Sequence, residues 1–104
     1  MARRIYGYMR VYDGLPEDQV RADEQRLREW AEGEGYDLVA VYQETDEGSV
    51  TELTELVGEL NRTGTRVIVV PSVEHFGRSP LLQEHLWAYV VGSAQAEVHE
   101  VSQS

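Results

Sequence analysis

The sequence contains no cysteine, only three prolines and no long apolar run. Without cysteine, the chain can form neither a disulfide nor a thiolate metal site. No apolar stretch approaches the roughly 20 residues that a membrane-spanning helix needs, and the N-terminal segment lacks the continuous apolar region of a signal peptide. We therefore expect a cytoplasmic protein with no membrane segment.

Positive charge is also scarce. All nine basic residues are arginine, and they face nineteen acidic residues, which gives a net charge of −10. A protein that binds duplex DNA usually carries basic patches that neutralise phosphates, whereas this chain repels phosphate on average. We expect DNA binding by the chain alone to be weak or absent, although a local arginine cluster can still hold a phosphate.

The hydrophobic pattern predicts one domain over residues 1–104, because the length allows a single core and no repeat or linker divides it. Branched and aromatic runs predict strands at 4–12, 36–43, 66–71 and 94–101. Helical periodicity predicts helices at 17–35, 49–64 and 79–92. The resulting order, βαβαβαβ, indicates an α/β fold with a mostly parallel four-stranded sheet and helices on both faces.

The second predicted helix carries the clearest signals. Ser49 and Glu52 have the spacing of a capping box, and Gly64 is a candidate end. Its apolar residues follow at i, i+3, i+4 and i+7: Leu53, Leu56, Val57 and Leu60. Before the third helix, Ser79 and Pro80 are typical of an N-cap followed by proline at the first helical position.

Two loops carry residues suited to phosphate chemistry. Arg10 and Tyr12 end the first strand, and Glu74, His75 and Arg78 follow the third. In a parallel sheet, ligand chemistry gathers beyond the carboxyl ends of the strands, so these five residues come within reach if the two strands are neighbours.

Each residue type in this group has a chemical use and a structural alternative. Guanidinium groups grip phosphate oxygens, a tyrosine hydroxyl can attack phosphorus, and histidine can move protons. The N–H groups at the helix start near Ser79 could bind an anion. Alternatively, Arg10 pairs with Glu74, Tyr12 only flanks the strand and His75 lies on the surface. The residues alone leave both interpretations open.

The chain resembles the catalytic domain of the serine recombinases, the resolvase/invertase family. Tyr8, Arg10 and Val11 fit the start of that family's Tyr-x-Arg-Val-Ser motif, and Gln25 fits its glutamine-rich helix start. The end of the run "RVIVVPSVEHFGRS" fits a Leu-Asp-Arg-Leu-Gly-Arg motif through the pair Gly77 and Arg78. The resemblance covers nearly the whole chain and implies the resolvase catalytic-domain fold.

The departures from the family pattern bear on activity. Tyr12 stands where the family has its nucleophilic serine, and Glu74 and His75 stand where it has Asp-Arg. Histidine removes a permanent cation and its bidentate fork. The family's further arginine before the second helix has no counterpart in "TDEGSVTEL". After the fourth predicted strand we expect neither the dimerising helix nor the C-terminal DNA-binding domain of the family.

The resemblance and its departures favour a catalytically inactive relative that serves as a binding or regulatory module in site-specific DNA recombination. Its partner would be another protein, such as a recombinase, and it would be a monomer or a dimer of a different kind. One alternative is an active strand-cleaving enzyme that uses Tyr12, with DNA affinity supplied by a partner. Another is a small phosphate- or nucleotide-binding module.

No cofactor or metal is expected. His75, His85 and His99 lie on separate predicted elements without ligand spacing. Trp87 and Tyr89 on the last helix are either core residues or part of an exposed apolar patch.

Overall fold

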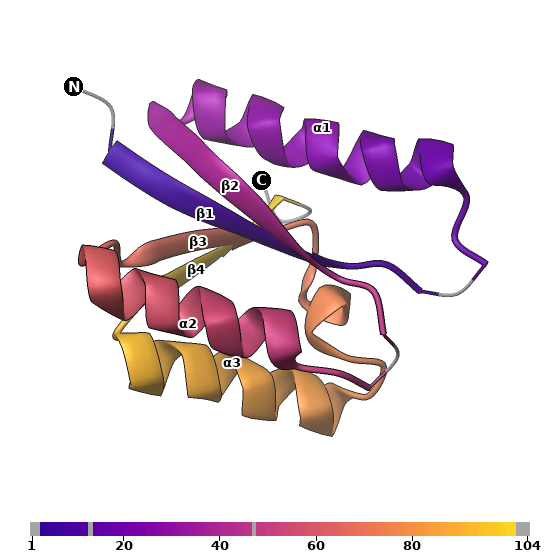
Figure 1. Cartoon of the computed structure of the whole chain (residues 1–104). Helices are drawn as coiled ribbons and strands as arrows, with labels where there is room; N and C mark the ends of the chain where they lie inside the picture. The colour runs from indigo at the N-terminus through magenta and orange to yellow at the C-terminus, as the bar shows by residue number, and fades with distance from the viewer. Residues whose placement is uncertain (1–2, 13, 47, 102–104) are drawn as a thin grey trace.

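Four parallel strands form one sheet in the order β2-β1-β3-β4 (Figure 1). This computed structural model describes residues 3–12, 14–46 and 48–101. The strands are β1 (Arg3–Arg10), β2 (Tyr36–Glu44), β3 (Val67–Val70) and β4 (Glu97–Glu100). The helices are α1 (Glu17–Gly33), α2 (Thr51–Thr63) and α3 (Pro80–Ala94), with a 3-10 helix, η1 (Val73–Phe76), before α3. The predicted α/β fold is confirmed, and β1 and β3 are neighbours in the sheet.

The helices cover both faces of the sheet, as predicted. α1 lies on one face and α2 and α3 on the other (Figure 1). On the α1 side, Leu27 and Ala31 pack against Ile5 and Met9 of β1. On the opposite side, the apolar stripe of α2 packs against β1, β3 and α3, and Trp87 and Tyr89 of α3 lie against this core. The two aromatic residues therefore belong to the edge of the core rather than to a separate exposed patch.

The central strands are buried because helices cover both faces of the sheet. Every residue of β3 is buried, and β1 is buried from Ile5 to Arg10. β1 ends at Arg10 rather than at residue 12, so Tyr12 lies in the loop beyond it. β4 is shorter than predicted, and α3 continues through Gly92 to Ala94.

The predicted capping box at the start of α2 is wrong. The N-cap residue is Val50, and the Ser49 hydroxyl accepts a bond from Thr51 N–H instead. The carboxylate of Glu44, at the end of β2, accepts the backbone N–H groups of Glu52 and Leu53. A carboxylate from a neighbouring strand therefore takes the place of a local cap, which sequence spacing does not reveal. The predicted cap of α3 is confirmed, because the Ser79 hydroxyl accepts the N–H of Leu82.

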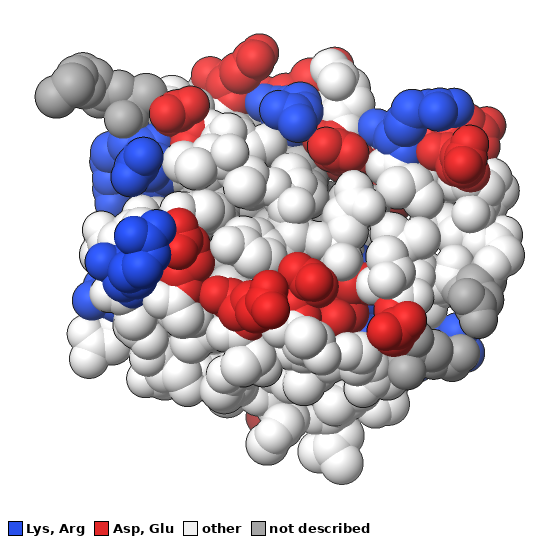
Figure 2. Space-filling view, viewed as in Figure 1, with Lys and Arg blue, Asp and Glu red and all other residues white. Residues whose placement is uncertain are grey.

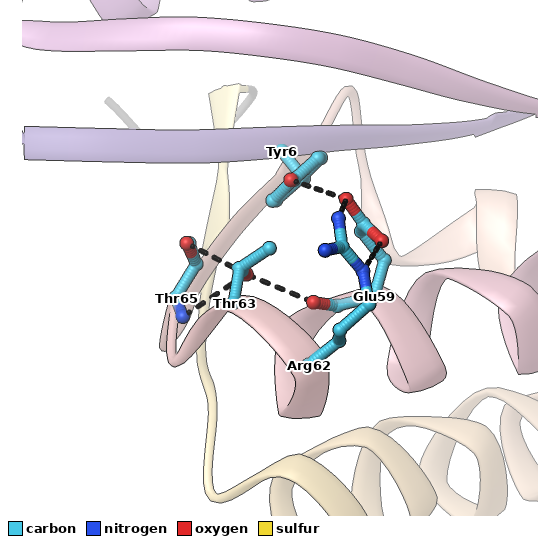
Figure 3. Close-up of polar contacts among 5 residues, drawn as sticks. All are labelled: Tyr6, Glu59, Arg62, Thr63 and Thr65. Carbon is cyan, nitrogen blue, oxygen red and sulfur yellow. Dashed lines mark hydrogen bonds and ion pairs between the residues drawn. The ribbon is translucent and has the colours of Figure 1, made fainter.

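The C-terminal turn of α2 is fixed to the sheet by a polar cluster (Figure 3). Glu59 receives two bonds from Arg62, at 2.8 and 2.7 Å, and a third from the Tyr6 hydroxyl at 3.0 Å. Thr63 donates to the Glu59 carbonyl and accepts the N–H of Thr65. Gly64 then ends the helix in the left-handed conformation, with φ at 75°.

Within the described residues, no helix is both long enough and apolar enough to cross a membrane.

Candidate functional site

The carboxyl ends of β1 and β3 bring all five candidate residues to one edge of the sheet. Arg10 closes β1, and η1 follows β3 and carries Glu74 and His75. Direct contacts join Arg10 to His75, Tyr12 to Glu74, and Arg78 to Tyr12. The predicted proximity is therefore confirmed, whereas a catalytic role for these residues remains a prediction.

Arg10 is held inside the protein and is only 4% exposed. Its side-chain Nε donates to the carbonyl oxygen of His75 at 3.3 Å, and its Nη2 donates to the Tyr8 hydroxyl at 3.2 Å. The alternative that Arg10 pairs with Glu74 is not the arrangement found. Two of its donor atoms serve the protein itself, which orients the guanidinium and reduces what it can offer to a ligand.

Tyr8 links this arginine to a buried carboxylate. The Tyr8 hydroxyl donates to Oε1 of Glu44 at 3.2 Å while it accepts from Arg10. Burial raises the pKa of Tyr8 well above its ordinary value; Arg10 opposes that rise and Glu44 adds to it. The phenol stays protonated and relays hydrogen bonding between the cation and the carboxylate, whose other acceptor sites cap α2. Sequence analysis identifies Tyr8 only as part of the family motif and does not identify Glu44, because sequence spacing does not reveal their contacts.

His75 takes part as a neutral imidazole. Its Nδ1 accepts the backbone N–H of Arg10 at 3.0 Å, so the lone pair on that nitrogen is already used. Burial lowers the pKa of His75 below its ordinary 6.5, and the cations of Arg10 and Arg26 add to that effect. The carboxylates of Asp23 and Glu74 oppose it. His75 is therefore an acceptor within the fold rather than a replacement for the permanent cation of the family motif.

The neutral state of His75 predicts a pH-dependent stability. Because its pKa is lower in the folded than in the unfolded protein, the unfolded state binds more protons below pH 6.5, and the free energy of unfolding falls as pH falls through that value. Urea unfolding between about pH 5 and 7.5 should show this slope, and His75→Asn should reduce it. Asparagine keeps an acceptor oxygen near the position of Nδ1 but does not titrate.

The matched control for this experiment is His85→Asn, which replaces an exposed imidazole on α3. The slope should persist in that variant. A His75→Asn protein with the wild-type slope would contradict the assignment of a neutral, hydrogen-bonded His75.

Tyr12 and Arg78 form the outer part of the site. The Tyr12 hydroxyl donates to the backbone carbonyl of Glu74 at 2.9 Å. The Cζ atom of Arg78 lies 4.9 Å from the centroid of the Tyr12 ring, a cation–π geometry. Tyr12 thereby ties the loop after β1 to the loop after β3.

A pocket of about 220 Å³ opens beside these residues. It is lined by Arg10, Tyr12, Gly48, Val50, Gly77, Arg78, Ser79, Leu82 and Leu86. A Cβ atom at Gly77 would lie 2.6 Å from Cδ2 of Leu82, so glycine is what allows the first turn of α3 to close this wall. The lining combines the arginines Arg10 and Arg78 with apolar side chains such as Leu82 and Leu86. No group of three potential metal ligands occurs among the described residues.

Comparison with known proteins agrees with this architecture. The family model "Resolvase, N terminal domain" matches residues 5–104. No curated protein matches the chain at a significant level.

Similar solved structures include a site-specific recombinase and catalytic domains of recombinases. A resolvase family site-specific recombinase from Streptococcus pneumoniae has a TM-score of 0.78 and 14% identity, with 97% of this chain and 73% of that chain covered. The N-terminal catalytic domain of TP901-1 integrase has a TM-score of 0.76 and 17% identity, with 98% and 79% covered.

The C-terminal catalytic domain of ISC1926 TnpA, an IS607-like serine recombinase, has a TM-score of 0.76 and 18% identity, with 94% and 69% covered. Identities this low show a common fold alone, whereas the family model spans almost the entire sequence. The chain, with its parallel sheet and its arginine-bearing strand end, belongs to the resolvase family, in the region that the N-terminal domain model describes.

Proposed function

We propose that this domain is a relative of the serine recombinase catalytic domain that has lost DNA cleavage and acts in site-specific recombination as a binding or regulatory module. The observation that carries the proposal is Tyr12, which the motif resemblance aligns with the nucleophilic serine and whose hydroxyl donates to a backbone carbonyl. Its partner is a protein, such as a recombinase, and its place of action is the cytoplasm.

The chemistry around Tyr12 supports this proposal. An attacking hydroxyl needs a base to take its proton. A carbonyl oxygen is too weak a base for that purpose, and it is the acceptor of the Tyr12 hydroxyl hydrogen. His75, the imidazole on the adjoining loop, already uses its Nδ1 lone pair on Arg10. A phenol also places its oxygen several ångströms farther from the backbone than serine does, beyond the roughly 1 Å tolerance of phosphoryl chemistry.

Electrostatics support the same proposal. The net charge of −10 repels a DNA backbone. Arg10, which corresponds to an arginine of the family motif, is buried and engaged with Tyr8 and His75. Weak DNA affinity and a site closed by its own hydrogen bonds are both expected of a domain that binds rather than cleaves.

The test is a search for a covalent protein–DNA adduct. The purified protein is incubated with a labelled duplex pool of random sequence, quenched with denaturant and resolved on a denaturing gel, beside an active serine recombinase on its own site. We expect no adduct from this protein, and none from Tyr12→Phe. An adduct that forms with the wild type and disappears in Tyr12→Phe would overturn the proposal and favour the active enzyme that uses Tyr12.

A further inference from the structure

The outer edge of β2 is an open strand edge. β2 is terminal in the sheet, and no strand within the described residues pairs with its outer side. It is nine residues long and contains no proline, lysine or arginine, three of the residues that commonly protect an edge from pairing. Its pairing with β1 has one irregularity, a bulge at Val39. The Val39 side chain is 39% exposed. Beyond the bulge, Ala40 to Glu44 pair regularly with β1.

The direction of the free backbone groups follows from one hydrogen bond. The carbonyl of Glu44 accepts the N–H of Val11, so the backbone groups of Glu44 face β1. Backbone groups of successive residues in a strand point to opposite edges. Those of Gln43 and Val41 therefore point away from the sheet, where an incoming strand would meet them.

A row of carboxylates runs beside this edge. Glu52, Glu55 and Glu59 follow one side of α2 at i, i+3 and i+7. Burial raises the pKa of Tyr42 on β2, and the negative charges of these three carboxylates add to the rise. Figure 2 shows acidic side chains gathered along α2 in the view of Figure 1.

The protein already binds one guanidinium in this row. Arg62 makes a two-bonded contact with Glu59, which also receives the Tyr6 hydroxyl (Figure 3). Glu52 and Glu55 make no ion pair among the described residues. Each presents to a cation the same group that Glu59 presents to Arg62.

We propose that the β2 edge binds an extended basic segment of a partner protein as an added strand, with its basic side chains on Glu52 and Glu55. Alternate residues of a strand lie about 6.6 Å apart, and the two glutamates are about 4.5 Å apart along the helix axis; long arginine side chains can cover that difference. The opposite face of the added strand would meet Leu38 and Val41, which are half-buried on the α1 side. The segment therefore alternates basic and apolar residues.

Charge favours a basic segment at this edge over a nucleic acid and over a second copy of the chain. The carboxylate row repels a nucleic-acid backbone. A second copy of the chain would bring its own row and another net charge of −10 to the same edge. The inference goes beyond the proposed function and holds whether or not Tyr12 proves reactive.

The experiment titrates the protein into a fluorescein-labelled peptide of alternating arginine and valine and follows anisotropy. We expect saturable binding, weakened about fivefold by the double change Glu52→Gln and Glu55→Gln, because an exposed ion pair contributes a modest amount. The matched control is the double change Glu29→Gln and Glu32→Gln, which removes two exposed carboxylates of α1. This control should lose less peptide affinity than the Glu52 and Glu55 variant. A peptide of alternating arginine and proline has the same charge but lacks every second N–H, and should bind more weakly.

Amide hydrogen exchange followed by NMR separates strand addition from charge attraction alone. The peptide should slow the exchange of the Val41 and Gln43 amides in the wild type. The inference is overturned if no peptide binds, if the two peptides bind equally, if both double variants lose affinity equally, or if these two amides are unchanged. Slow exchange of the same amides on raising the protein concentration without peptide would identify a second copy as the occupant instead. None of these readouts involves DNA cleavage, so failure here and failure of the proposed function are distinguishable.

Discussion

Replacing Glu44 with alanine is expected to lower the free energy of unfolding by about 3–5 kcal/mol, because one buried carboxylate stabilises three separate parts of the fold. Glu44 is 2% exposed. It accepts the hydroxyl of Tyr8 and the backbone N–H groups at the start of α2. It is also the anion that faces Arg10 across Tyr8. Alanine leaves these donors without their acceptor and Arg10 without its nearby negative charge.

Urea unfolding followed by circular dichroism measures this loss. The variant Glu44→Gln provides an intermediate step between the wild type and Glu44→Ala. Glutamine retains one acceptor oxygen but removes the charge and places an amide N–H₂ near the helix donors, so an intermediate loss is expected. Glu55→Gln, an exposed carboxylate on α2, is the matched control and should change stability by less than about 0.5 kcal/mol. Equal effects at Glu44 and Glu55 would show that Glu44 contributes only as general surface charge.

A double-mutant cycle that combines Tyr8→Phe with Glu44→Ala shows whether the hydrogen-bonded residues Arg10, Tyr8 and Glu44 act as a unit. Residues in one hydrogen-bond network have coupling energies of about 0.5–3 kcal/mol, whereas independent sites add. The Tyr8–Glu44 contact predicts coupling in this range. Strict additivity would mean that Glu44 stabilises α2 without help from Tyr8.

The elements and their order could be predicted because local signals and burial agree over most of the chain. β3 is a short apolar run between Arg66 and Pro71 and is covered on both faces. α3 begins with serine and proline at positions that only a helix start favours. Such signals lie within a few residues of one another, so a single sequence displays them.

The interior of the candidate site could not be predicted in the same way. The sequence places Arg10 and His75 on the same edge of the sheet, but their hydrogen bonds join residues 65 positions apart. Glu44 lies in a polar run that is typical of a turn, yet pairing with β1 buries it opposite Arg10. The predicted Ser49–Glu52 capping box fails because the carboxylate of Glu44, at the end of β2, accepts the Glu52 N–H in place of the Ser49 hydroxyl.

Phe76 is the second position where a large loss of stability is expected. Its ring is fully buried, stacks on Tyr8 at 5.7 Å between centroids and meets Trp87 edge-on at 5.9 Å. Phe76→Ala should lower the free energy of unfolding by about 3–5 kcal/mol, because it removes these contacts and leaves a cavity between η1 and α3. Chemical denaturation at pH 7.5 measures the loss.

Phe76→Leu is the informative control, since leucine occupies the corresponding place in the family motif that this chain resembles. It fills most of the volume and should cost about 1–1.5 kcal/mol. Because Phe76 directly follows His75, the alanine variant should also loosen η1 and weaken the bond from Arg10 N–H to the imidazole. The His75 signal in NMR should then titrate nearer its ordinary 6.5 in Phe76→Ala than in Phe76→Leu. An unchanged titration in a destabilised Phe76→Ala would mean that Phe76 supports the core but does not position the site.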